Sequence, residues 1–334
     1  MKDYSSIVVS SKIRLLRNLM GFEFPSMSEG AVGLKVLNKL ADTILKIDDN
    51  FKLYTIETLS ELDKFVMHEK SLISLRLIDS LHGAVLLSSN EDVSLMINET
   101  DHLCETCVLP GLSLIPAYDK INDFDNQILS KLDIAFDDSI GFMTSNIKDV
   151  GTGLKASVKL FLPGLSLLGK MRDVVASFAN QGISVSNYFD DLESKAYTFV
   201  VCNTETIGRR ETDYVVKVTE AAIKISELEI QARTELMSAQ RIDDVKDQVF
   251  RAWGILTNCY KINEEEAEQY LGKLKMGVAL DIIRFKEVNF IDKLIVDILP
   301  YSLTKISGEK VTSVDLDKYR ATFLTNILKA KRIK

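Results

Sequence analysis

Apolar and polar positions in the first part of the chain follow two distinct periods. Strand-like alternation of β-branched and apolar residues recurs in four segments: 6–10, 84–98, 154–162 and 196–202. Within the second segment, the polar residues 89–92 are placed to turn a hairpin. The three–four spacing of apolar residues predicts helices over 31–47 and 165–180. Strands separated by helices predict an α+β fold built around an antiparallel sheet flanked by helices.

The pattern becomes purely helical in the last third of the chain. Residues 214–240 have the composition of one long helix, and Asn263 is placed to cap another that begins with three glutamates. Between these two, a helical apolar face is formed by Ile242, Val245, Val249, Phe250, Trp253 and Leu256. A last helix is predicted near 314–330. We therefore expect an α+β domain over 1–230 and a smaller all-helical domain over 231–334.

Composition narrows the class of protein. A chain of 334 residues with 46% hydrophobic and 27% charged residues is typical of a globular protein with two domains. The formal net charge of −7 argues against a nucleic-acid partner, and the basic end KAKRIK is interpreted as a solvated helix terminus. No segment approaches the ~18 apolar residues of a membrane span, and the N-terminus has no secretory pattern. Four cysteines without such a signal predict free thiols and a cytoplasmic location.

Three short motifs each allow a functional and a structural interpretation. Cys104 and Cys107 form a CxxC, but a zinc site needs a second close pair, and the other two cysteines are isolated. Residues 164–171 nearly match a phosphate-binding loop, yet Met171 stands where a magnesium-binding Ser or Thr is required. The Gly-Thr-Gly of 151–153 predicts only a turn when taken alone. We expect no protein-bound metal.

Three longer segments carry distinctive motifs: SSKIRLLRN at 10–18, MINETDHL at 96–103 and DVGTGLKASVKLFLP at 149–163. Taken together, they resemble one family, the ATP:guanidino phosphotransferases, and within it the bacterial protein arginine kinases (the McsB family). The first segment is similar to the family's Ser-Ser-Arg-Ile-Arg-Leu-Ala-Arg-Asn, and the second to its Met-Ile-Asn-Glu-Glu-Asp-His-Leu. DVGTGLKASVKLFLP at 149–163 resembles Asn-Val-Gly-Thr-Gly-Leu-Arg-Ala-Ser-Val-Met-Leu-His-Leu-Pro. Further similar segments are EKSLIS at 69–74, FRAWGIL at 250–256 and DKYRA at 317–321.

The resemblance implies transfer of the γ-phosphoryl group of Mg·ATP to a guanidinium, a reaction that depends on positioning and electrostatics. The family holds the phosphates with arginines, whose planar forks bind oxygens in pairs, and grips the guanidinium with carboxylates. The positions that the resemblance assigns to nucleotide binding are Ser11, Lys12, Arg14, Ser71, Cys104, Lys155, Ser157 and Ser186.

Most charged groups at these positions differ from the family pattern. Lys12, Cys104 and Lys155 each stand in place of a clamp arginine, whereas Arg14 is retained. Ser71 stands in place of a nucleotide-side histidine.

The substrate side has changed as well. Thr100 replaces the glutamate that follows Glu99, and Asn146 stands at the Cys-Pro of the reactive loop. In the motif Arg-Gly-x-Tyr-Gly-Glu, the arginine is Ser186 and the glutamate is Asp191. The resemblance thus places Glu99, Thr100, Asn146 and Asp191 at the catalytic positions, with ATP binding weak or lost.

Two functional interpretations remain open. The first is a catalytically impaired pseudokinase that acts as an interaction or regulatory protein in bacterial protein quality control. The second is an active, divergent arginine kinase in which a nearby acid such as Glu99, Glu105, Asp190 or Asp191 replaces the lost carboxylate. By resemblance, the partners would be a zinc-finger activator, a stress-response repressor and a Clp-type unfoldase, and the chain would form a homodimer.

A second predicted site lies in the helical part. The family motif Arg-Asp-x-x-Arg-Ala, which binds phosphoarginine, is matched by Asp317 and Arg320, with Leu316 in place of the first arginine. A lone arginine still pairs with phosphate, but more weakly than two. The alternative is an ordinary helix-surface ion pair between Asp317 and Arg320.

Overall fold

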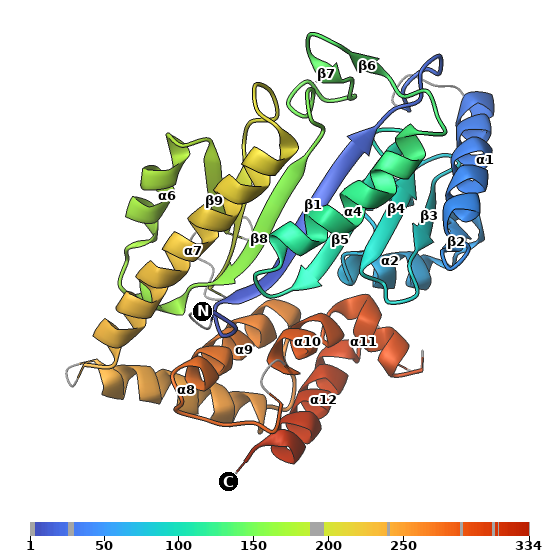
Figure 1. Ribbon diagram of the computed structural model, residues 1–334. Coiled ribbons are helices and arrows are strands. Elements are labelled where there is room, and N and C mark those ends of the chain that lie inside the picture. Colours follow the sequence, from blue (N-terminus) through green and yellow to red (C-terminus); the bar gives the residue numbers. More distant parts are fainter. Residues whose placement is uncertain are drawn as a thin grey trace. The chain divides into compact units, whose positions relative to one another are not determined.

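The computed structural model describes residues 4–25, 30–187, 197–238, 241–287, 290–308, 311–312 and 314–333 (Figure 1). Within these residues, one sheet of eight strands has the order β2-β3-β4-β5-β1-β8-β10-β9. Its strands are β1 (Val8–Arg17), β2 (Lys52–Thr55), β3 (Ala84–Leu87), β4 (Val93–Ile97), β5 (Leu103–Pro110), β8 (Lys155–Phe161), β9 (Ile183–Asn187) and β10 (Thr198–Asn203). A separate hairpin consists of β6 (Phe136–Asp137) and β7 (Gly141–Phe142). The long strand β1 pairs antiparallel with both β5 and β8.

Helices connect and follow these strands. Those of the α+β part are α1 (Gly30–Ile47), α2 (Glu61–Glu69), α3 (Leu75–Ile78), α4 (Leu114–Leu129), α5 (Pro163–Leu167), α6 (Met171–Ala179) and α7 (Glu211–Leu236), with a short 3-10 turn, η1 (Ile56–Thr58). The C-terminal part holds α8 (Ile242–Leu256), α9 (Glu264–Ala279), α10 (Phe290–Asp297), α11 (Pro300–Ile306) and α12 (Leu316–Lys331). The predicted α+β sheet followed by a helical region is therefore confirmed.

Most of the local predictions made from periodicity or capping residues hold. The β3–β4 hairpin turns at the predicted polar segment, and Asn263 caps α9 by accepting from the Glu266 amide. The helix predicted over 165–180 is wrong in one respect, because it is divided into α5 and α6. Gly169 between them has φ of +70°, which ends a helical turn. The sequence analysis missed β5 and α4, because Glu105 and Thr106 interrupt the apolar pattern of β5.

The two faces of β1 have different surroundings. Helix α4 packs on β1 and β5, and α1 packs on β4 and α4. The odd-numbered side chains of β1, such as the fully buried Ile13 and Leu15, share the face of Arg17, whose guanidinium binds Asp125 of α4. The even-numbered side chains point to the opposite face. On that face one hydrophobic cluster contains Leu16, Ile56, Leu72, Ile73, Leu77, Val85, Leu87, Met96 and Cys104.

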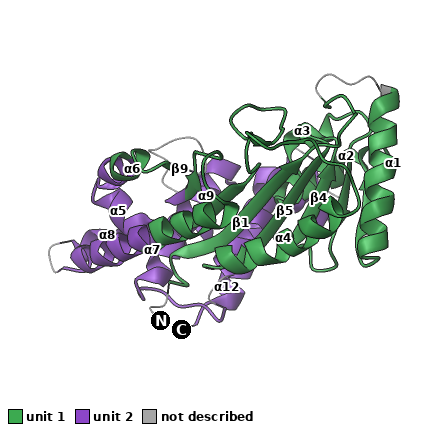
Figure 2. Ribbon diagram, turned by 45° about the horizontal axis from the view of Figure 1, so that its top comes forward, with its two compact units in different colours: residues 1–160, 176–185, 200–223 green, residues 161–175, 186–199, 224–334 purple. Residues whose placement is uncertain are grey.

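The chain divides into two compact units, which Figure 2 colours separately. The first comprises residues 1–160, 176–185 and 200–223, and the second comprises 161–175, 186–199 and 224–334. This division differs from a single boundary near residue 230, because α5 belongs with the later helices. The carboxylate of Glu229 in α7 accepts from the Gly164 and Leu165 amides at 2.8 and 2.9 Å, which joins α5 to the second unit.

None of the described helices is long and apolar enough to cross a membrane.

Candidate active site

Strand pairing assembles most of the predicted nucleotide-side residues on one face. Lys12 of β1 lies opposite Ser157 of β8, and Arg14 lies opposite Lys155. Because side chains two apart on a strand share a face, these four side chains point to the same side of the sheet. Cys104 joins them, since its partner Leu16 continues the even-numbered face of β1. The backbone register thus brings together residues that lie far apart in the sequence.

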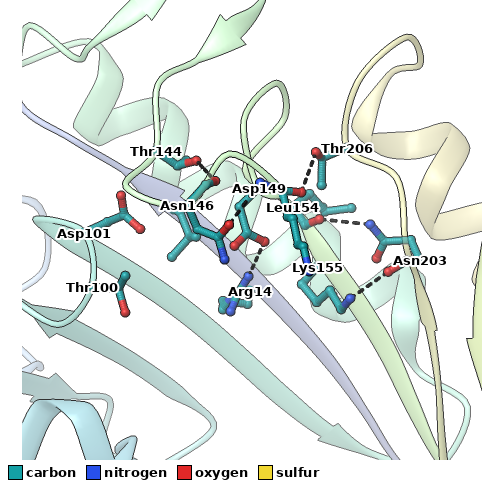
Figure 3. Close-up of polar contacts among 12 residues, drawn as sticks. Arg14, Thr100, Asp101, Thr144, Asn146, Asp149, Leu154, Lys155, Asn203 and Thr206 are labelled. Atoms are coloured by element: carbon teal, nitrogen blue, oxygen red, sulfur yellow. Dashed lines mark hydrogen bonds and ion pairs between the residues drawn. The ribbon is translucent and has the colours of Figure 1, made fainter. Parts of the chain in front are cut away.

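Arg14, the retained arginine, is held by a carboxylate. Its Nη2 atom lies 2.7 Å from Oδ1 of Asp149, and Figure 3 shows the two side chains pointing toward one another. The side chains are 31% and 17% exposed, so the pair is partly withdrawn from water. A phosphate must displace Asp149 before it can bind this edge of Arg14, and it is repelled by the same carboxylate. Asp149 therefore neutralises the one arginine that the clamp has kept.

Lys155 and Ser157 are also engaged by the protein itself. The Lys155 ammonium donates to the carbonyl oxygen of Asn203 at 2.8 Å (Figure 3). The Ser157 hydroxyl lies 3.4 Å from the Lys12 carbonyl, a long hydrogen bond. Lysine also cannot hold two phosphate oxygens with a planar fork, so this substitution removes geometric control as well as one contact.

Cys104 belongs to the protein interior. Its side chain is only 2% exposed within the hydrophobic cluster that includes Leu16 and Met96. Burial, more than any neighbouring charge, raises the pKa of the Cys104 thiol to about 12, although Arg14 and Lys12 oppose that effect. The thiol is neutral at physiological pH and provides no charge for a phosphate. Where the family motif has an arginine, this chain has a core residue.

The turn between β4 and β5 carries the substrate-side acids. Ser74 donates its hydroxyl to Glu99 at 2.6 Å, and the Thr100 amide donates to the other carboxylate oxygen. Burial raises the pKa of Glu99, but these hydrogen bonds and the charge of Arg14 outweigh burial and leave the pKa below its ordinary value. Glu99 is thus an oriented carboxylate, whereas Thr100 offers only a hydroxyl, which lies 3.4 Å from Arg76.

Asp101 locks this turn to the loop that precedes β8. Its Oδ1 atom accepts from Asn18 at 2.6 Å and from the Ser145 amide at 2.7 Å. Asn146, one residue further, is exposed and accepts from the Lys148 amide at 3.1 Å through its side chain. Figure 3 shows Thr100 and Asp101 in the β4–β5 turn on one side of Arg14, and it shows Asn146 and Asp149 in the loop that precedes β8. The loop is therefore ordered, but Asn146 has no nucleophilic or acidic group.

The other predicted residues lie on the opposite face of β1 or in other elements. Ser11 points to the opposite side of β1, where its hydroxyl donates to the Gly111 carbonyl at 2.8 Å and accepts from the Ser113 amide at 3.0 Å. It joins β1 to the start of α4, which explains its full burial without a ligand. Ser71 is exposed in the turn after α2, with φ of +61°. Ser186 is exposed in β9, and Asp191 lies outside the described residues, as does Asp190.

The sequence analysis did not predict a buried ionic cluster on the opposite face of the sheet from Arg14. Arg17, 1% exposed, binds Asp125 at 2.6 Å and Glu211 at 3.1 Å. Glu105 of β5 points into this cluster, where its carboxyl group shares a side-chain hydrogen bond with Asp125. Burial, followed by the charge of Asp125, raises the pKa of Glu105 well above its ordinary value, against the opposing charge of Arg17. Glu105 is therefore a core carboxyl group with a raised pKa, and it is directed away from Arg14.

Asp149 is the site residue that the sequence analysis passed over. The only signal was its identity, since the family motif begins with asparagine at this position. The consequence of that difference depends on the ion pair to Arg14, which is remote in sequence.

In the helical part, Arg320 is a structural residue. It is 2% exposed, and its guanidinium donates to the carbonyls of Ile298 at 2.9 Å and Ile262 at 3.0 Å. It also binds Asp317 at 2.6 Å. Burial, followed by the charge of Glu264, raises the pKa of nearby Glu268 to about 7, while the charge of Arg320 lowers it. These contacts occupy the guanidinium that a phosphoarginine would need.

The remaining motifs have structural roles. Cys104 and Cys107 are three apart on β5, so their side chains point to opposite faces and cannot bind one metal together. Among the described residues, no cluster of three or more His, Cys, Asp or Glu is placed to hold a metal ion. The loop at 164–171 directs its amides at the Glu229 carboxylate, which leaves no place there for phosphate.

Comparison with solved structures defines the class of fold. The duplicated taurocyamine kinase from Schistosoma mansoni superposes with a TM-score of 0.63 at 22% identity, covering 77% of this chain and 39% of that duplicated chain. Lombricine kinase gives a TM-score of 0.60 at 16% identity, covering 73% and 70% of the two chains. The family model described as ATP:guanido phosphotransferase, C-terminal catalytic domain, matches residues 33–232. The fold is therefore that of a guanidino phosphotransferase.

Sequence comparison then defines the branch. The model described as Protein-arginine kinase McsB C-terminal domain matches residues 242–334. The protein-arginine kinase of Pelotomaculum thermopropionicum is 35% identical over 327 residues, covering 95% of this chain and 91% of the relative. That of Bacillus subtilis is 32% identical over 325 residues, covering 96% and 89%. The chain belongs to the protein arginine kinase family.

The family implies ATP with magnesium, and the residues present fit it incompletely. The strand face offers cations at Lys12, Arg14 and Lys155, which suits phosphate in charge. Arg14 is bound to Asp149, however, and Lys155 is bound to a backbone carbonyl. Two of the three cations on this face are therefore engaged by groups of the protein itself.

Proposed function

We propose that this chain is a protein arginine kinase homologue that has lost phosphoryl transfer and acts through protein contacts. The observation that carries the proposal is the ion pair between Arg14 and Asp149. It neutralises the retained clamp arginine, at a site where Cys104 is a buried neutral thiol. Removing one oriented donor from such a site lowers the rate by about 10²–10³. By resemblance, the proposed partners are a zinc-finger activator, a repressor and a Clp-type unfoldase, with a homodimer as the working form.

The test is phosphoarginine formation on a basic acceptor protein with ATP and magnesium, followed by phosphorus NMR and by mass spectrometry under conditions that preserve the acid-labile bond. The Bacillus subtilis protein-arginine kinase serves as the positive control. We expect this chain to fall at least about 10³-fold below it, because two or more clamp contacts are missing. Transfer at a comparable rate, abolished by Arg14→Ala, would refute the loss of activity.

One observation favours a second candidate, an active divergent kinase. Glu99 is an ionised, oriented carboxylate on the turn that should grip the substrate. If it replaces the lost glutamate, Glu99→Gln abolishes transfer while Glu23→Gln, a carboxylate outside the site, leaves it unchanged. The same assay distinguishes the two candidates, since the pseudokinase has no transfer activity for either substitution to remove.

A further inference from the structure

A second cleft, separate from the strand face of Arg14, lies in the first unit beside the β6–β7 hairpin. Its volume is about 630 Å³. Apolar side chains of the hairpin and of the segment before α7 line it, and they are unusually open to water: Phe136 is 48%, Ile140 45% and Ile207 57% exposed. Exposed apolar groups gathered around one cleft are typical of a binding surface.

The cleft is preformed by its backbone contacts. Phe142 exchanges backbone hydrogen bonds with Gly151 at 2.7 and 3.1 Å, and the Thr152 amide donates to the Thr206 carbonyl at 2.9 Å. The rings of Phe136 and Phe142 meet edge to face, with centroids 5.1 Å apart. The Arg17 guanidinium packs against the face of the Phe142 ring, with its Cζ atom 3.6 Å from the ring centroid. Little ordering is therefore needed when a ligand binds, which favours affinity.

Charge on the rim of the cleft is unbalanced. Arg209 and Arg210 are exposed, and neither guanidinium forms an ion pair with any described residue. The two acids beside them are already engaged. Glu211 accepts from Arg17 and Tyr118, and Asp213 accepts from the Arg210 amide at 3.1 Å. Two cations with no ion-pair partner among the described residues thus flank an apolar cleft, on a chain whose formal net charge is −7.

We propose that this cleft docks an acidic, apolar peptide segment of a partner protein. An aromatic or branched aliphatic side chain of the peptide contacts Phe136, Ile140 and Ile207. Carboxylates next to it in the peptide pair with Arg209 and Arg210, because arginine binds carboxylates in a two-pronged geometry. A nucleic acid fits less well, since its many phosphates are repelled by the net negative charge of the chain. The inference deepens the proposed interaction role and rests on residues outside the kinase site.

The experiment measures fluorescence anisotropy of the labelled peptide acetyl-Gly-Asp-Glu-Phe-Ile-Asp-Gly with the full-length chain. Two matched peptides replace the acids by their amides, or replace Phe and Ile by Ala. The test variants are Arg209→Ala/Arg210→Ala and Ile140→Ser. Their controls are Arg172→Ala, an exposed arginine of α6, and Leu34→Ser, an exposed apolar residue of α1. Circular dichroism and melting temperature confirm that each variant is folded. Arg209→Ala/Arg210→Ala is the variant least able to affect folding, because both side chains are exposed and form no ion pair with the described residues.

We expect the acidic, apolar peptide to bind, and either test variant to weaken it by about tenfold or more while both controls bind as the parent does. Binding should also weaken with salt, because the arginine contacts are exposed. Equal binding of the amide peptide, unchanged binding in both test variants, or no binding overturns the proposal. A change of molecular mass on Arg209→Ala/Arg210→Ala also overturns it and assigns the cleft to a second copy. Kinase activity in the transfer assay would refute the proposed loss of activity without affecting this result.

Discussion

Replacing Asp149 by asparagine should restore phosphate affinity to Arg14. The substitution keeps the size of the side chain and the Asp149 backbone amide, which donates to the Asn146 carbonyl at 2.9 Å. It removes the charge that binds Nη2 of Arg14 at 2.7 Å. A hydrogen bond to a charged group contributes about 1.5–3 kcal/mol, and exposed ion pairs about 0–1 kcal/mol. Because the Arg14 and Asp149 side chains are 31% and 17% exposed, we expect the free energy of their interaction to lie between those limits.

A phosphate that no longer displaces this carboxylate gains about 1–2 kcal/mol, or roughly 5–30-fold in affinity. The assay is a thermal-shift titration with Mg·ATP and Mg·ADP, because binding to the folded state raises the melting temperature without any chemistry. At a nucleotide concentration equal to the parent's Kd, binding stabilises the parent by about 0.4 kcal/mol, and a tenfold tighter variant by about 1.4 kcal/mol. For a chain of 334 residues, the variant should therefore shift by about 1–2 °C more than the parent.

Each protein is compared with its own melting temperature without nucleotide, since breaking the ion pair also lowers the stability of the unliganded variant. Asp42→Asn, an exposed carboxylate on α1, is the matched control and should behave as the parent does. If Asp149→Asn shifts no more than the parent at millimolar nucleotide, Asp149 does not block the site and the reasoning is refuted. An equal gain in Asp42→Asn would trace the effect to net charge instead.

Three further predictions follow from buried groups. Arg320→Ala should lower the free energy of unfolding by about 2–4 kcal/mol, because it leaves the carbonyls of Ile262 and Ile298 unsatisfied. Urea unfolding measures this loss, and a loss below about 1 kcal/mol would contradict the structural role of Arg320. Since burial and Glu264 raise the folded pKa of Glu268 to about 7, the stability from its protonated form is present below the unfolded pKa of about 4.3 and lost as pH rises through about 7. Glu268→Gln should thus gain stability relative to the parent between pH 5 and pH 8, and parallel pH profiles of the two would exclude Glu268. In a native thiol titration with DTNB at pH 8, Cys259 should react first, because Cys104 and Cys107 are buried with pKa values raised to about 12 and about 11. Rapid reaction of Cys104 would show that the hydrophobic cluster around it opens to solvent.

Local signals in the sequence were sufficient for much of the fold. The β3–β4 hairpin, the Asn263 cap and the helical face of α8 depend on contacts between near neighbours, so periodicity and capping residues predicted them. Strand β5 was not predicted, because Glu105 and Thr106 are polar residues inside a buried strand and interrupt its apolar pattern. The environment of Glu105, where burial and Asp125 raise its pKa against the charge of Arg17, is built by residues of β1, α4 and α7.

The sequence by itself determined that the chain has the segments of a protein arginine kinase and that Lys12, Thr100, Cys104 and Lys155 replace its charged groups. Only the tertiary structure decided what the remaining groups do. Arg14 meets Asp149, Ser11 points to the other face of β1, and Arg320 binds backbone carbonyls, through contacts with residues as far as 135 positions away. The physical reason is that residue identity sets the charge that a side chain carries, whereas strand register and packing set which opposite charge, carbonyl or apolar group surrounds it.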